Sequence, residues 1–285
     1  MQVRCVTPRI VGMSSPIPEG KYCSIRAGMT LHYHEAGTGE PVVFLHGSGP
    51  GASGYSNFKG NYPVFANRGF RAIVPDLPGF GLSSKPEDAA YVLDFFVEAV
   101  HGLVTKLGFG RCILLGNSLG GAIALKYTLD HPAMVSKLIL MAPGGLEELP
   151  TYLQMEGIQK MIQVFTAGPM DLDAMRRLLT LQLHDPTLIS DELLRERVGV
   201  CADQPRTVLT TMRVPNMEER LGEVKCPVLG FWGTNDRFNP VSGATKIVER
   251  CPQARVLLLN RCGHWVMVEH RDLFNRTCVD FLENG

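Results

Sequence analysis

The stretch CILLGNSLGGAIALKY, residues 112–127, decides the fold. An apolar run ends at the polar pair Asn117-Ser118, and a glycine-rich segment with helical character follows. Residues 116–120, GNSLG, match the pattern G-x-S-x-G between a strand and a helix. Such a sharp turn holds its central residue in a strained backbone conformation, and the small neighbours let the chain segments approach closely. The pattern predicts a nucleophilic serine at a helix N-terminus, whose dipole and free N–H groups stabilise negative charge.

Similar apolar runs recur along the chain and are bounded by Gly, Pro, Asp or Asn. Runs that are apolar on both faces, separated by segments of helical period, indicate parallel strands covered by helices. Two earlier stretches, YCSIRAG and MTLHYHEAG, alternate more and predict an antiparallel hairpin at the sheet edge. The expected architecture is a doubly wound α/β sheet. Its parallel strands are expected at PVVFLHG (41–47), RAIVPD (71–76), RCILLGN (111–117), KLILMAP (137–143), CPVLGFWG (226–233) and ARVLLLN (254–260).

Residues 144–215 contain no strand-like run, only amphipathic stretches such as LDAMRRLLTLQLH and SDELLRERVGVCA. An insertion that follows the carboxyl end of a strand lies over the sheet edge where ligands bind in open α/β folds. We therefore expect a core of residues 1–143 and 216–285 with a helical lid over 144–215. The alternative is an ordinary helical connection that has lengthened, since a crossover needs only about a dozen residues.

The charge balance argues for a small-molecule partner. Lysine plus arginine and aspartate plus glutamate each total 28, so the chain has no net charge to attract nucleic acid or an anionic membrane. No apolar run approaches the roughly 18 to 20 residues of a spanning helix. The N-terminus, MQVRCVTPRIVGMSSPIPEG, has prolines and charges rather than a long hydrophobic signal segment. We expect a cytoplasmic protein.

The cysteines predict neither a disulfide framework nor a metal site. There are eight, at positions 5, 23, 112, 201, 226, 251, 262 and 278, scattered without a C-x-x-C pair. Free thiols are expected, with disulfides as the alternative. Cys251, Cys262 and His264 lack the spacing of a zinc finger or ribbon, so we expect no metal, and nothing else in the sequence calls for a cofactor.

A serine nucleophile needs a base and a third group that orients the base. Asp236, in FWGTNDRFNP, follows a predicted strand at the same sheet edge as Ser118. His264, in LLLNRCGHWVMVEH, follows the next strand behind a glycine. The order Ser118, Asp236, His264 is that of α/β-hydrolases. An Asx-turn is the alternative role for Asp236, and the other histidines are interpreted as surface or packing residues, with His46 in a structural contact.

The tetrahedral intermediate of acyl transfer also needs N–H donors for its oxyanion. The glycine-rich loop FLHGSGPGASG follows the strand at 41–47 at the predicted edge. We assign the donors to the amides of Ser48 and Leu119. A phosphate-binding loop is the competing interpretation, but the G-K-[ST] ending is missing.

Six stretches together resemble the meta-cleavage product hydrolases, the carbon–carbon bond hydrolases of bacterial aromatic degradation within the α/β-hydrolase superfamily. The resemblance covers nearly the whole chain and is weakest before residue 20 and in the lid. It implies a mostly parallel eight-stranded sheet flanked by helices, with a helical lid inserted after the sixth strand. The stretches are HGSGPGASGYSNF, PDLPGFGLSSKP, GNSLGG, MAPGG, GTNDRFNP and CGHWVMVEHRDLFN.

The resemblance implies a serine-dependent enzyme that converts a 2-hydroxy-6-oxohexa-2,4-dienoate to 2-hydroxypenta-2,4-dienoate and a carboxylic acid. It also implies a homodimer or higher homo-oligomer. The implied substrate-binding residues hold the carboxylate and 2-oxo end: Asn57, Asn117, Arg197 and Trp265, with Gly49 of the glycine-rich loop. Alternatives remain for each: Arg197 could be a solvated charge paired with Glu192 or Glu196, the asparagines could cap turns, and Trp265 could be core packing.

Two departures leave the C6 substituent of the substrate open. Tyr55 stands where many relatives carry Trp, and the lid lacks a match at the residues that face the acyl group. The apolar lid residues expected to line that pocket are Met155, Ile158, Met161, Ile162, Val164, Phe165 and Leu178, although a helical stripe is also typical of core packing. The alternative functions are a carboxylesterase or lactonase with the same triad and a ligand-binding receptor that turns over slowly.

Overall fold

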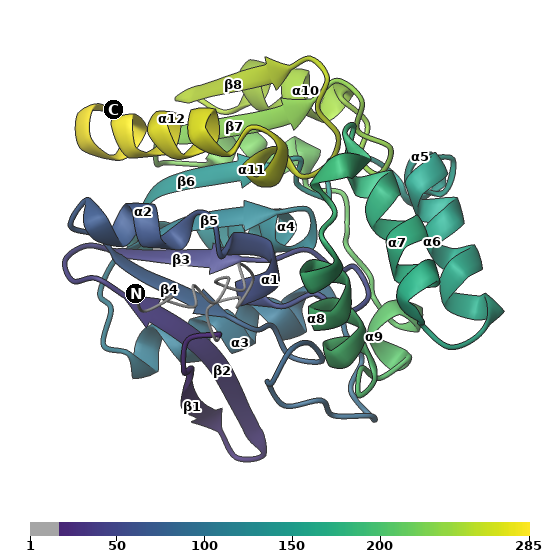
Figure 1. Cartoon of the computed structure of the whole chain (residues 1–285). Coiled ribbons are helices and arrows are strands. Elements are labelled where there is room, and N and C mark those ends of the chain that lie inside the picture. Colours follow the sequence, from purple (N-terminus) through teal and green to yellow (C-terminus); the bar gives the residue numbers. More distant parts are fainter. Residues whose placement is uncertain (1–16) are drawn as a thin grey trace, which may run out of the picture.

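Eight strands form one sheet in the order β1-β2-β4-β3-β5-β6-β7-β8 (Figure 1). The structure is a computed structural model and is described for residues 17–285. Pairing is antiparallel between β1 and β2 and between β2 and β4, and parallel elsewhere. All six predicted parallel strands and the edge hairpin are confirmed. The strands are β1 (Lys21–Arg26), β2 (Met29–Ala36), β3 (Pro41–Leu45), β4 (Arg71–Pro75), β5 (Cys112–Asn117), β6 (Val135–Met141), β7 (Val228–Gly233) and β8 (Ala254–Leu259).

Helices cover both faces of the sheet because its central strands are apolar on both. In β3, Val43 and Leu45 belong to one hydrophobic core, whereas Val42 and Phe44 belong to another. This alternation follows from the two-residue period of a strand. The first core is completed by α3 (Leu93–Lys106), α4 (Leu119–Asp130) and α10 (Ser242–Arg250). The second is completed by α1 (Gly54–Phe58), α2 (Tyr62–Asn67), α11 (Val266–Glu269) and α12 (Arg271–Asn284).

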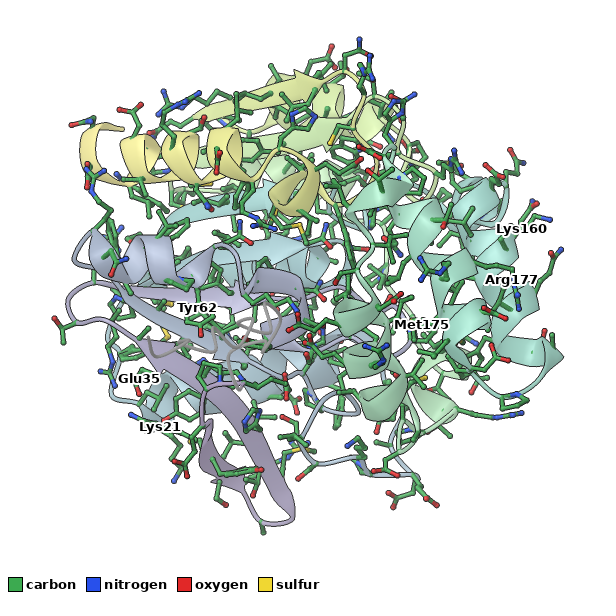
Figure 2. The ribbon with its side chains drawn as sticks, in the orientation of Figure 1. Lys21, Glu35, Tyr62, Lys160, Met175 and Arg177 are labelled. Carbon is green, nitrogen blue, oxygen red and sulfur yellow. The ribbon has the colours of Figure 1, made fainter. Side chains whose placement is uncertain are left out.

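Five further α-helices lie between β6 and β7 in the chain and gather beside the ends of the central strands (Figure 1). Their outer faces carry charged residues such as Lys160 and Arg177, which point away from the core, while Met175 is fully buried (Figure 2). The amphipathic pattern predicted for this region therefore reflects packing against the sheet edge. The helices are α5 (Leu149–Leu153), α6 (Glu156–Ala167), α7 (Leu172–Gln182), α8 (Asp191–Cys201) and α9 (Thr207–Thr210).

The described residues also bear on the thiols and on membrane insertion. All seven cysteines from Cys23 to Cys278 are free thiols. Cys5 and residues 1–16 of the N-terminal stretch that is expected to lack a signal segment lie outside the described residues. Within residues 17–285, none of the helices combines the length and apolarity that crossing a bilayer requires.

Candidate active site

Ser118 occupies a sharp turn between β5 and α4. Its backbone angles are φ 56° and ψ −116°, a left-handed conformation that is costly for a residue with a Cβ. Gly116 and Gly120 permit this turn: a Cβ on Gly116 would collide with the Gly120 carbonyl, and a Cβ on Gly120 with the Leu45 carbonyl. The close packing fixes Ser118 at the N-terminus of α4, half-buried, with its side chain in a cavity.

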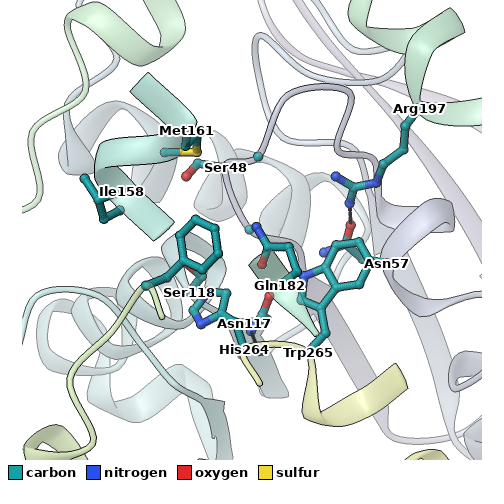
Figure 3. A pocket seen from close by; sticks show the side chains of 13 residues that line it. Ser48, Asn57, Asn117, Ser118, Ile158, Met161, Gln182, Arg197, His264 and Trp265 are labelled. Carbon is teal, nitrogen blue, oxygen red and sulfur yellow. Dashed lines mark hydrogen bonds between the residues drawn. The ribbon is translucent and has the colours of Figure 1, made fainter. Parts of the chain in front are cut away.

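His264 and Asp236 form a buried pair on the loops that follow β8 and β7. His264 Nδ1 lies 2.7 Å from Asp236 Oδ2, and the other carboxylate oxygen accepts hydrogen bonds from the backbone N–H groups of Phe238 and Asn239. Asp236 therefore makes an Asx-turn as well as orienting the imidazole. His264 and Ser118 line the same cavity (Figure 3), although within residues 17–285 the Ser118 hydroxyl makes no hydrogen bond to the ring. Such bonds are often long in free enzymes.

The backbone amides of Ser48 and Leu119 are the predicted oxyanion donors. Ser48 belongs to the loop after β3, and Leu119 is the first residue of α4, directly after Ser118. In the described part of the chain, neither N–H donates to a protein acceptor. Both residues line a cavity together with Ser118. Free N–H groups next to a nucleophile can bind an oxyanion.

His46 supports the loop that carries Ser48. Its Nδ1 lies 2.7 Å from the Gly47 carbonyl oxygen, and its Nε2 accepts a hydrogen bond of 3.0 Å from the Leu77 backbone N–H. Complete burial lowers the pKa of His46 to about 4. The ring is thus neutral near pH 7, with both nitrogens engaged, in the structural role that the sequence predicted.

Arg197, on α8, places a positive charge in the cavity and is only 2% exposed. Its Nη2 donates to Asn57 Oδ1 at 2.6 Å, its Nη1 to the Pro50 carbonyl at 3.3 Å, and its guanidinium stacks 4.6 Å from the Trp265 ring centroid. Burial lowers its pKa to about 10, so the side chain remains charged at neutral pH. The alternative pairing with Glu192 or Glu196 is not observed: Glu196 pairs with Lys59 instead, at 2.8 Å.

The other predicted substrate-binding residues line the same cavity as Arg197 (Figure 3). Asn117 Nδ2 donates to the carbonyls of Met141 and His264, which ties β5 to the histidine loop. Asn57 lies within α1, whose N-cap is Ser53, so it caps no helix. Gly49 is close to Arg197, because a Cβ there would lie 3.5 Å from Nη1. The structure thus brings together Asn57, Asn117, Arg197, Trp265 and Gly49.

Gln182, the last residue of α7, also lines this cavity and was missed by sequence reasoning. Its backbone carbonyl accepts hydrogen bonds from the N–H groups of His264, at 2.7 Å, and Trp265, at 3.3 Å. Its side chain is 8% exposed. A glutamine at a helix end carries no distinctive sequence signal, so only the packing of α7 against the histidine loop reveals it.

Three buried side-chain atoms in this cavity have no hydrogen-bond partner in the described structure: Arg197 Nε, Asn117 Oδ1 and Gln182 Oε1. Unpaired buried polar atoms are uncommon because each costs about 1–3 kcal/mol. The three residues that carry these atoms, one cationic donor and two amides, line a cavity whose chemistry suits a ligand with an anion and a hydroxyl donor. Among the described residues, no group of three or more His, Cys, Asp or Glu side chains is arranged to hold a metal ion.

A second cavity, of about 680 Å³, opens on the other side of Ser118. Four of the apolar residues predicted to line an acyl pocket line this cavity: Ile158, Met161, Ile162 and Phe165. The prediction is wrong for the other three. Val164, on α6, lines a separate surface pocket, and Leu178, on α7, is buried, because each lies on another side of its helix. Met155 is the N-cap residue that precedes α6.

The chain is similar to known hydrolases along most of its length. The alpha/beta hydrolase family matches residues 42–277. A 2-hydroxy-6-oxo-6-phenylhexa-2,4-dienoate hydrolase of Burkholderia cepacia is 40% identical over 269 residues, covering 90% of this chain and 92% of that protein. A 2-hydroxy-6-oxononadienedioate/2-hydroxy-6-oxononatrienedioate hydrolase of Comamonas testosteroni is also 40% identical, with the same coverage of 90% and 92%.

The solved structures agree with this similarity. The meta-cleavage product hydrolase CumD of Pseudomonas fluorescens IP01, in a complex with acetates, superposes with a TM-score of 0.81 at 29% identity, covering 92% of this chain and 97% of that chain.

Proposed function

This chain belongs to the meta-cleavage product hydrolases of the alpha/beta hydrolase family, and we propose that Ser118, His264 and Asp236 carry out its reaction. That reaction is the hydrolysis of a carbon–carbon bond of a 2-hydroxy-6-oxohexa-2,4-dienoate. One observation carries the assignment of the site. The nucleophile shares its cavity with a buried, uncompensated Arg197 and two unpaired amide oxygens. A 2-hydroxydienoate offers the matching groups, a carboxylate and a hydroxyl.

The first step moves a proton. The substrate loses the proton of its 2-hydroxyl and gains one at C5, which turns the dienol into a 2,6-diketone with a C3=C4 double bond. Arg197 and the Trp265 N–H bind the carboxylate and the C2 oxygen, where negative charge develops. This step is needed because the bonding electrons of C5–C6 can leave only when they can delocalise through C3=C4 to the C2 carbonyl.

The second step breaks the carbon–carbon bond. His264, oriented by Asp236, takes the proton of Ser118, and the serine oxygen attacks the C6 carbonyl. The N–H groups of Ser48 and Leu119 bind the resulting oxyanion. Collapse of this intermediate breaks C5–C6, and the leaving dienolate takes the proton from His264 to become 2-hydroxypenta-2,4-dienoate. Water, deprotonated by His264, then removes the acyl group from Ser118 as the carboxylic acid. In the alternative, His264 activates water for direct attack at C6.

Replacing Ser118 by alanine tests the proposal. Stopped-flow absorbance with a 6-phenyl dienoate should show a fall in turnover of about 10² to 10⁶-fold in Ser118→Ala. A burst of pentadienoate in the wild-type protein would support the acyl-enzyme rather than direct attack by water. Wild-type turnover in Ser118→Ala would remove the serine from the mechanism.

An ordinary esterase would have the same triad but no use for Arg197. Its substrates lack a carboxylate, so the buried guanidinium would stay unpaired in every complex. Fast hydrolysis of aryl acetates, with no cleavage of any dienoate, would favour the esterase.

Two further expectations belong to the proposal. Helices α5–α9, within residues 144–215, act as a lid that excludes water from the diketone. The chain works in the cytoplasm as a homodimer or higher homo-oligomer, as the family resemblance implies. Sedimentation velocity of the purified protein measures the assembly.

A further inference from the structure

The cavity beyond Ser118 has the properties of an acyl pocket for a large group. It begins at Ser118 and Leu119 and continues between the lid helices α5, α6 and α9. Its volume is about 680 Å³. A cavity of about 150 Å³ is enough to bind benzene, so this one has room for a group several times larger than a phenyl ring.

The walls of this cavity are mainly apolar, and part of that apolar surface lies open in the free protein. Leu149, Leu153 and Ile162 line the cavity and are 60%, 46% and 47% exposed, respectively. Large exposed apolar side chains next to a reactive centre mark a ligand-binding surface. A methyl or single phenyl group would leave most of this surface uncovered, whereas a multi-ring group would bury it.

The lining carries no net charge. It contains one carboxylate, Glu148, and one guanidinium, Arg213. Asn216 Nδ2 donates to Glu148 at 2.8 Å, and Arg213 Nη1 donates to the backbone carbonyls of Thr210 and Met212. One charge of each sign gives no preference for a second carboxylate at the end of the acyl chain.

We infer that the C6 substituent of this chain's substrate is an uncharged group of two or more fused rings, rather than methyl, isopropyl, single phenyl or a carboxylate-bearing chain. The inference rests on the proposed function, since it identifies the space beyond Ser118 with the acyl side of the dienoate. Burial of one CH₂-sized unit contributes about fourfold in kcat/KM, and a second fused ring adds four carbons, so even partial burial of that ring gives about tenfold or more over phenyl.

The test compares four dienoates whose C6 substituents are methyl, phenyl, a fused two-ring aromatic group and carboxyethyl. We expect kcat/KM, measured from loss of the dienoate absorbance, to be at least about tenfold higher for the fused-ring substrate than for phenyl. Equal or higher kcat/KM for phenyl, methyl or carboxyethyl overturns the inference and leaves the proposed function intact. Failure to cleave any of the four overturns the proposed function itself.

A matched pair of variants on α6 checks that the cavity is responsible. Ile162→Trp fills the cavity and should reduce the ratio of fused-ring to methyl kcat/KM by about tenfold or more. Lys160→Trp adds the same side chain to the exposed side of the same helix (Figure 2) and should leave that ratio unchanged. An unchanged ratio in Ile162→Trp would show that the acyl group binds elsewhere.

Discussion

Arg197 is a buried cation that the described protein leaves without a carboxylate partner. Lowering its pKa from 12.5 to about 10 corresponds to roughly 3 kcal/mol of lost stability. That cost is present below pH 10, where the guanidinium is charged in folded and unfolded chains alike, and it declines as the pH rises from 10 towards 12.5. A substrate carboxylate supplies the missing partner, so substrate binding offsets the free-energy cost of burying the charged guanidinium.

Arg197→Gln should therefore change stability and activity in opposite directions. Glutamine removes the buried charge and can still donate to Asn57, so we expect the free energy of unfolding to stay equal or rise. Truncating one partner of a buried charge pair costs about 2–5 kcal/mol, so kcat/KM for a dienoate should fall by about 30-fold or more. Urea unfolding and steady-state kinetics measure the two effects. A large loss of stability would show that Arg197 is mainly structural.

His46 should make the protein sensitive to mild acid. Its pKa is about 4 in the folded protein against 6.5 unfolded, so between these values the unfolded chain binds more protons. Stability is full above pH 6.5 and is lost as the pH falls towards 4, by up to about 3 kcal/mol. The free energy of unfolding, measured across this range, should fall less steeply in His46→Gln. An unchanged slope would assign the acid sensitivity to other groups.

At the scale of elements, a backbone contact joins the loop after β3 to α8, one of the helices proposed to form the lid. Gly51, in the loop after β3, has a φ of +67°, and a Cβ there would collide with the Arg197 carbonyl on α8. The Gly51 N–H also donates to Gln204 Oε1, at 2.9 Å. The loop that carries the predicted oxyanion donor and the helix that carries the predicted anion-binding residue therefore hold each other in place.

Two glycine-to-alanine variants separate this contact from backbone strain. Gly51→Ala and Gly28→Ala both force alanine into a left-handed conformation, but Gly28, with a φ of +72°, has nothing within 4 Å of its added Cβ. Each should lose about 1–2 kcal/mol of stability through the strain, and Gly51→Ala should lose more because its Cβ also meets the Arg197 carbonyl. Only Gly51→Ala should also lower kcat/KM for a dienoate, by about tenfold or more, because α8 must move. Equal kinetics in both variants would argue against the contact.

How much of these elements the sequence predicts depends on the range of the interactions involved. The strands and the positions of Ser118, Asp236 and His264 follow from local patterns, because each of these residues lies just after an apolar run. Gln182 reaches the cavity only because α7 packs against the loop of His264, a contact between segments about eighty residues apart. Val164 and Leu178 were assigned to the wrong surface because periodicity defines the face of a helix but not what lies opposite it.

At the scale of the whole molecule, the site is divided between parts that are joined at a few contacts. Ser118, Asp236 and His264 come from the strand ends, whereas Gln182, Arg197 and the apolar walls come from the helices between β6 and β7. The volume of the acyl cavity depends on how these helices pack against each other, so no sequence pattern predicts it.

Binding should couple these parts measurably. With saturating dienoate, Ser118→Ala should show slower amide hydrogen exchange in α6 and α8, while the β1–β2 hairpin stays unchanged. Ligand at about 100 times its Kd stabilises the folded state by about 2.7 kcal/mol, which a thermal shift detects. A thermal shift without slower exchange in α6 and α8 would mean that these helices do not close over the substrate.

The uncompensated guanidinium has a practical consequence for the resting enzyme. The Arg197 guanidinium alone does not distinguish the carboxylate of a dienoate from acetate, formate or citrate. Only contacts with the remainder of the substrate can do so. We therefore expect carboxylate buffer salts to act as competitive inhibitors. The apparent Michaelis constant should then rise with the concentration of such salts in the assay.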